Sequence, residues 1–101
     1  MTVPEATALS IYERDNYRCR YRGEDVGSTA EIYWRGRPTV DHLKPVSSGG
    51  NDDANNLYTS CGSCNAYKGK RTFNGVDDVR AFIAKYKIEE FGNWYPRNVR
   101  P

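Results

Sequence analysis

The sequence predicts a single α+β domain, with two short central strands and a short helix placed between an N-terminal and a C-terminal helix. The chain has 101 residues, a common size for one domain. Its aromatic content of 13% argues against disorder. Apolar residues recur at helical spacing near both ends, whereas the middle has short apolar runs separated by a polar loop. We therefore treat residues 1–101 as one domain.

The first helix is predicted to begin near Thr2 and to end at Asp15-Asn16. Thr2 and Glu5 have the spacing of a capping box, and Pro4 suits the first helical turn. The predicted buried stripe of this helix consists of Ala6, Leu9, Ile11 and Tyr12.

Residues 17–37 are predicted to contain a turn, a loop and one short strand. The turn covers residues 17–23 and carries Cys19. Residues 24–30 are polar and form the loop, and Ile32–Trp34 forms a short strand that ends in a turn at residues 35–37.

Two antiparallel strands are predicted at residues 39–43 and 57–59. The loop between them, residues 47–55, has no large apolar residue and contains Gly49-Gly50. It is long for a hairpin, and long loops in compact domains are often functional.

Two further helices are predicted after the strands. The first begins at Ser63 or Cys64 and reaches about Lys70. The second covers about residues 76–88, and Asp77 and Asp78 suit its N-terminus, where the helix dipole favours negative charge. Residues 91–101 form a basic and aromatic tail.

The central segment contains the groups needed to hydrolyse a phosphodiester. His42 is the only histidine in the chain, and histidine is a suitable general base because it is largely neutral near pH 7. Asp41 beside it supplies a carboxylate and Asn65 an amide oxygen. Mg²⁺ and Mn²⁺ prefer oxygen ligands and need only one or two from the protein.

The order and spacing of these motifs resemble the HNH endonuclease family. The resemblance is carried by Val40-Asp41-His42-Leu43-Lys44-Pro45, Ser48-Gly49-Gly50, Asn56-Leu57, Cys61-Gly62-Ser63-Cys64-Asn65 and Lys68. Upstream, Arg14–Tyr21 resembles the stretch that leads into the first zinc knuckle of that family. The motif core therefore covers about residues 12–70, which is well over half of the chain.

The resemblance implies a ββα-metal fold and a DNA endonuclease of the kind often found in phages and prophages. It implies that His42 is the general base, that Asp41 and Asn65 bind Mg²⁺ or Mn²⁺, and that Asn56 fixes the loop and orients the histidine. Asn65 replaces the final histidine of many members, which makes this the His-Asn-Asn variant. From the residues alone, the alternatives are that Asn56 is an ordinary turn residue and that Asn65 only caps the helix, and for Asn65 the role of metal ligand is favoured over the cap.

Lys68 follows Asn65 by about one helical turn, where the resemblance implies contact with the scissile phosphate or the leaving group. The basic residues expected to bind DNA are Arg35, Arg37, Lys68, Lys70 and Arg71. A solvated, mixed surface is the alternative, because the net charge is only +2.

The zinc-binding half of the pattern is incomplete. Cys61 and Cys64 form one CxxC knuckle, but the other has Cys19 with Arg22 in the position of the fourth ligand. Structural zinc usually takes four ligands, and arginine stays protonated. Glu24, Asp25 or water would complete the site, or Arg22 would bridge the loops without zinc. Together these observations favour a weak or absent zinc site.

Two other functions compete with the nuclease. A DNA-binding module with a degenerate site would not need Asp41 and His42 together. A thiol-disulfide oxidoreductase would place Cys61 and Cys64 in a βαβ unit, for which the sequence has no pattern.

The apolar runs are too short for a signal peptide or a membrane span, so a cytoplasmic protein with reduced thiols is expected. A site with one metal ion and one general base cuts one DNA strand at a time, so double-strand cleavage would require a homodimer or two encounters.

Overall fold

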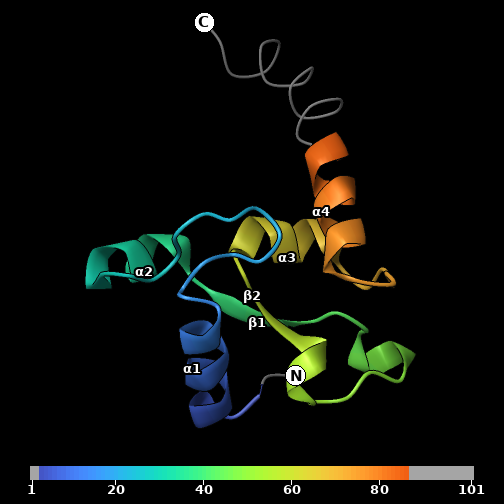
Figure 1. Ribbon diagram of the computed structural model, residues 1–101, viewed down its shortest axis with the longest axis horizontal. Coiled ribbons are helices and arrows are strands. Elements are labelled where there is room, and N and C mark those ends of the chain that lie inside the picture. The colour runs from blue at the N-terminus through green and yellow to red at the C-terminus, as the bar shows by residue number, and fades with distance from the viewer. Residues whose placement is uncertain (1–2, 87–101) are drawn as a thin grey trace, which may run out of the picture.

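The computed structural model describes residues 3–86 and has four helices and two strands in this range. In chain order these elements are α1 (Glu5–Arg14), α2 (Ala30–Gly36), β1 (Thr39–His42), β2 (Leu57–Ser60), α3 (Gly62–Lys68) and α4 (Val76–Lys85) (Figure 1). Two short 3₁₀ helices, Val46–Ser48 and Ala54–Asn56, lie in the loop between the strands. The predicted tail at residues 91–101 and the last two residues of the predicted 76–88 helix lie outside the described residues.

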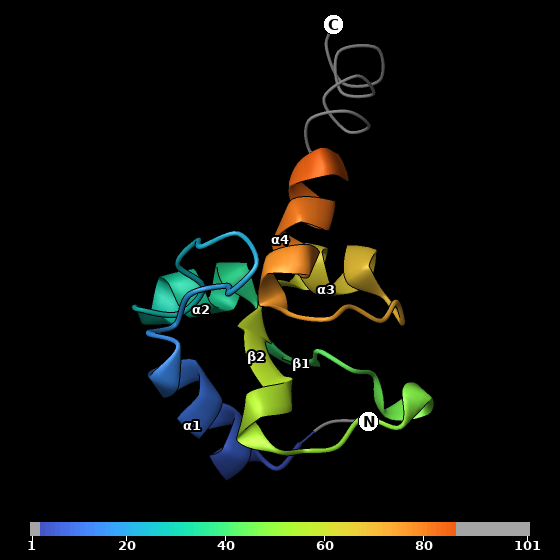
Figure 2. The ribbon, with the colours of Figure 1, turned by 45° about the vertical axis from the view of Figure 1, so that its right-hand side comes forward.

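The predicted α+β class and its ββα core are confirmed. Strands β1 and β2 pair antiparallel, with Thr39 opposite Ser60 and His42 opposite Leu57. Helix α3 follows β2 directly and contacts β1 and α4, whereas α1 contacts both strands. The two-stranded sheet thus lies between α1 and α3, which appear on opposite sides of it in both views (Figures 1 and 2).

The predicted strand at Ile32–Trp34 is wrong, because this segment belongs to α2. The hydroxyl of Thr29 accepts a hydrogen bond from the Ile32 backbone N–H at 3.1 Å and caps the helix. Arg37 closes the helix with a positive φ of 44°. The Trp34 side chain is 72% exposed, so its apolar character does not reflect a buried strand.

Helix α1 begins later than predicted and buries a narrower stripe. Its N-cap is Pro4, which makes no side-chain capping hydrogen bond. Ile11 and Tyr12 are buried as expected, but Ala6 and Leu9 are exposed. The buried residues of α1 lie only in its C-terminal half, where the Thr59 hydroxyl of β2 donates to the Ile11 carbonyl oxygen at 3.4 Å.

The main core forms where α3 and α4 meet the segment that follows α1. Val26, Val79 and Ile83 are buried there together with Tyr21 and all three cysteines. Tyr67, Phe73 and Phe82 pack against this cluster and extend it. The core is small, so the cysteines make up an unusually large share of it.

The buried side chain of Asp15 joins α1 to the sheet. Its carboxylate forms ion pairs with Arg14 at 2.9 Å and Arg20 at 2.8 Å, and accepts the Thr59 backbone N–H at 2.9 Å. Burial opposes ionisation of the carboxyl, but the hydrogen bonds from Arg14, Thr59 and Arg20 outweigh it and lower the pKa of Asp15.

We expect Asp15→Asn to lower the free energy of unfolding by about 3 kcal/mol at neutral pH, because it leaves two arginines without their buried partner. The pKa of Asp15 in the folded protein lies below its unfolded value of about 3.9. The stabilisation by the Asp15 carboxylate is therefore complete well above a pH of about 3.9 and is lost as the pH falls through the folded pKa. Urea unfolding at neutral and acidic pH measures both effects. Glu13→Gln, an exposed change on α1, is the control. Equal stability of both variants at neutral pH would contradict this role.

Candidate active site

The end of β1 places Asp41 and His42 beside the loop and α3. Asp41 is buried, and the His42 side chain is 11% exposed. Both residues line a cavity of about 660 Å³, together with Asn65 of α3 and Lys70 just after it. The structure therefore brings together the three residues expected to supply the base and the metal ligands.

Two side chains hold the carboxylate of Asp41 in place. The Tyr21 hydroxyl donates a hydrogen bond to Oδ2 at 2.6 Å, and Lys68 Nζ forms an ion pair with the same oxygen at 3.2 Å. Burial, followed by the charge of Asp41, raises the pKa of Tyr21, which keeps its hydroxyl protonated as a donor. Within residues 3–86, the hydrogen bonds and ion pairs of this carboxylate fall on Oδ2, which leaves Oδ1 for another ligand.

Lys68 is fully buried, in contrast to the expected DNA contact at an exposed helix end. Besides its ion pair with Asp41, its Nζ donates a hydrogen bond to the His42 carbonyl oxygen at 3.0 Å. Lys68 therefore braces the two residues at the end of β1 from within the protein.

His42 has a partner that the sequence reasoning missed. Its Nε2 lies 2.7 Å from Oδ1 of Asp52, in the loop between the strands. The carboxylate can only accept in this contact, so neutral His42 carries its proton on Nε2 and keeps the lone pair of Nδ1. Asp52-Asp53 stood out in the sequence only as one of several acidic pairs.

Asn56 holds together the loop that carries Asp52. Its side-chain oxygen accepts the Lys44 backbone N–H at 2.8 Å, and its amide nitrogen donates to the carbonyl oxygens of Lys44 at 3.1 Å and Asn51 at 2.8 Å. Its own carbonyl oxygen accepts from the Leu43 N–H at 2.9 Å. The Asn56 side chain thus links Asn51, the residue before Asp52, to Lys44, which follows β1.

Gly50 allows the loop to turn back on the same segment. Its N–H donates to the Pro45 carbonyl oxygen at 2.9 Å. A β carbon at this position would lie 1.7 Å from the Lys44 carbonyl oxygen, which no other residue can accommodate without moving the backbone.

The other expected DNA-binding residues lie in three places. Lys70 lines the cavity of Asp41 and His42, whereas Arg35 and Arg37 line a different cavity of about 640 Å³ beside α2. Arg71 donates to the Tyr67 carbonyl oxygen at 2.7 Å and stacks on the Tyr67 ring. Only Lys70 among them shares a cavity with the Asp-His pair.

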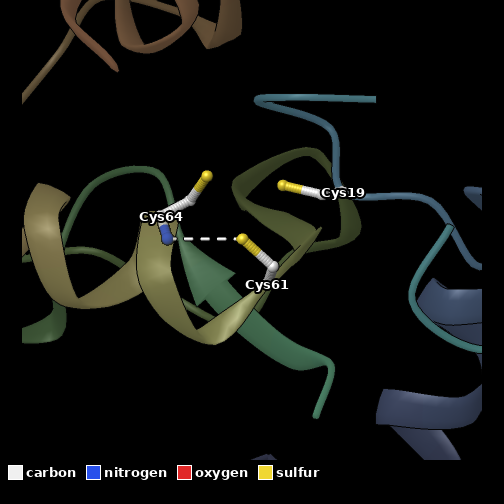
Figure 3. Close-up of side chains that lie close together, drawn as sticks. All are labelled: Cys19, Cys61 and Cys64. Atoms are coloured by element: carbon white, nitrogen blue, oxygen red, sulfur yellow. Dashed lines mark hydrogen bonds between the residues drawn. The ribbon is translucent and has the colours of Figure 1, made fainter. Parts of the chain in front are cut away.

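The three cysteines form one buried cluster, with their sulfur atoms within 4.8 Å of one another. Cys61 caps α3, and its sulfur accepts the Cys64 backbone N–H at 3.3 Å. Cys19 reaches the pair from the turn after α1, and the three sulfurs face a common space (Figure 3). Thiols are soft donors that bind Zn²⁺ well, so this cluster is suited to a metal ion.

The three cysteines shift the pKa values of one another. Hydrogen bonds from the Cys61 and Cys64 side chains lower the pKa of Cys19. The contact with Cys19 in turn raises the pKa of Cys61 and of Cys64. All three sulfurs can therefore be thiolates together only beside a cation. A redox role is not favoured, because β1 and β2 are antiparallel and the CxxC pair is not in a βαβ unit.

The fold and these residues define a domain of the ββα-metal class. The family model of the HNH endonucleases matches residues 18–71, more than half of the chain, and the chain belongs to this family. Members are generally nucleases that act on DNA and use divalent metal ions. No curated protein and no solved structure gives a significant match. Among residues 3–86, no helix has both the length and the apolar character needed to cross a bilayer.

Proposed function

We propose that the protein is a metal-dependent DNA endonuclease in which His42 is the general base. The observation that carries this proposal is the shared cavity of Asp41, His42 and Asn65. A base next to two oxygen donors is the minimum set for activating water against a phosphodiester.

Asp41 and Asn65 would hold the metal ion, for which Mg²⁺ or Mn²⁺ is the best match to a carboxylate and an amide oxygen. Tyr21 and Lys68 occupy Oδ2 of Asp41, so Oδ1 is the atom available to the ion. When bound, the ion supplies positive charge beside the scissile phosphate.

His42 would take the proton from the attacking water at Nδ1. Its contact with Asp52 fixes the ring and favours the tautomer in which Nδ1 is unprotonated. As His42 gains the proton, its positive charge lies against the Asp52 carboxylate, which stabilises it. Asn56 supports this arrangement by holding the loop.

DNA would be held by Lys70 near the cleavage site and by Arg35, Arg37 and Arg71 further away. In place of the phosphate contact first expected for Lys68, we propose that it supports Asp41 from the interior. Each chain has one proposed general base, so each encounter would cut one DNA strand. A second copy of the protein would be needed to cut both strands.

Incubation of supercoiled plasmid with the protein and Mg²⁺ or Mn²⁺ tests the proposal. Nicking that requires the metal ion supports the nuclease. DNA binding without nicking under any of these conditions would instead support a DNA-binding module with a degenerate site.

Asp52→Asn is expected to slow nicking roughly tenfold at saturating DNA, the equivalent of losing one charge-assisted hydrogen bond of about 1.5 kcal/mol. DNA affinity should not change, because Asp52 acts through His42. Single-turnover cleavage rates and fluorescence anisotropy measure the two quantities. Asp53→Asn, on the adjacent exposed residue, is the control. If both variants cleave at the wild-type rate, Asp52 has no role in orienting the base.

A further inference from the structure

Two backbone hydrogen bonds close the turn that carries Cys19. The Gly23 N–H donates to the Cys19 carbonyl oxygen at 2.7 Å, and the Cys19 N–H donates to the Glu24 carbonyl oxygen at 2.9 Å. Gly23 has a positive φ of 78°, which lets the turn close. The turn thus brings the backbone of Glu24 back beside that of Cys19.

The spacing of the three sulfurs suits a tetrahedral ion. Zinc–sulfur bonds of about 2.3 Å put the sulfurs of a tetrahedral site about 3.8 Å apart. The sulfurs of Cys19, Cys61 and Cys64 all lie within 4.8 Å of one another, and all three residues are buried. Small movements would therefore complete three corners of a zinc site.

The side chain of Glu24 lies near Cys61, although its oxygens are outside the group of ligand atoms that lie within 4.8 Å of one another. It lines the same cavity as Cys61, whose pKa is raised first by Cys19 and also by Glu24. The Arg22 guanidinium pairs with Glu24 Oε2, so Oε1 is not taken by that ion pair. Asp25 is less suitable, because its carboxylate caps the backbone N–H groups of Gly27 at 3.0 Å and Ser28 at 2.9 Å.

We propose that the protein holds a structural zinc ion with the thiolates of Cys19, Cys61 and Cys64 and the carboxylate of Glu24. Glu24 replaces the cysteine that residue 22 does not provide. Arg22 binds the outer oxygen of this carboxylate and offsets the excess negative charge of three thiolates and a carboxylate around one divalent cation. The proposal is independent of the nuclease activity, and it differs from the weak or absent site that Arg22 alone suggested.

Such an ion would join two segments that are far apart in the sequence. Cys19 belongs to the turn after α1, whereas Cys61 and Cys64 begin α3, the helix that carries Asn65. The cluster lies within the main core beside Val79 and Ile83 of α4. Binding of zinc would release the thiol protons and stabilise the fold that positions α3.

Cobalt substitution of the full-length protein tests the ligand set. Co²⁺ bound to thiolates gives sulfur-to-cobalt charge-transfer absorption, whereas an ion bound only by Asp41 and Asn65 gives none. We expect one Co²⁺ per chain with this absorption, displaced by one Zn²⁺. The Cys19→Ser variant has one thiolate ligand fewer, so its sulfur-to-cobalt charge-transfer absorption should be weaker by the contribution of that thiolate. Absence of charge-transfer absorption in the wild type would overturn the zinc site.

Glu24→Gln tests the fourth ligand. We expect zinc affinity, measured by competition with a chromophoric chelator, to fall by about 10–100-fold or more, and the cobalt ligand-field bands to shift. Glu31→Gln, an exposed change on α2, should match the wild type in both measurements. Circular dichroism of the zinc-loaded variants verifies that they are folded. Wild-type affinity and an unchanged cobalt spectrum in Glu24→Gln would overturn the assignment of Glu24.

Discussion

His42→Ala is expected to slow DNA nicking by roughly 10²- to 10⁴-fold while leaving DNA affinity nearly unchanged, because it removes the proposed general base but none of the residues proposed to hold DNA. The His42 side chain makes one described side-chain contact, with the exposed loop residue Asp52, so its loss should disturb the fold little. Plasmid nicking under single-turnover conditions and fluorescence anisotropy with labelled duplex measure the two effects.

Asn55→Ala is the matched control for this variant, because Asn55 is an exposed residue of the same loop. It should nick DNA at the wild-type rate. A His42→Ala protein that nicks as fast as the control would contradict a histidine base. Loss of DNA binding together with nicking would indicate that His42 supports the fold instead.

The largest loss of stability is expected for Lys68→Met. The change removes the buried ammonium that pairs with Asp41 Oδ2 and that donates to the His42 carbonyl oxygen. Among residues 3–86, it leaves the Asp41 carboxylate with only the Tyr21 hydroxyl, so we expect the free energy of unfolding to fall by about 3–5 kcal/mol. Urea unfolding followed by circular dichroism measures this change.

Lys70→Met makes the same chemical change on an exposed residue two positions further along the chain, and it should alter stability little. If both methionine variants unfold at the same urea concentration, the buried ion pair is not a major contribution to stability. In that case Lys68 would be free to act elsewhere, including at the phosphate.

The elements that could be predicted from the sequence are those with a clear local pattern. The two strands, α3 and α4 follow from apolar spacing and from the breaks around them, and Asp41, His42 and Asn65 follow from the order of their motifs. Helix α2 was missed because three consecutive apolar residues resemble a strand, and the capping residue Thr29 was assigned to the loop.

The contacts that could not be predicted join residues distant in sequence. Asp52 meets His42 because Asn56 folds the loop back on β1, and the spacing of ten residues gives no sign of that contact. The position of Lys68 one turn after Asn65 is clear from the sequence, but not that its side chain enters the interior beneath Asp41. Both depend on which face of an element packs against its neighbour.

Gly50 provides no functional group, yet it limits how the candidate active site can vary. Any side chain there would push the loop away from the Lys44 carbonyl oxygen, and the loop carries Asp52. The separation between the histidine and its carboxylate partner is therefore governed by a residue that touches neither. During sequence divergence, the surface of this loop is free to change, but its path is not.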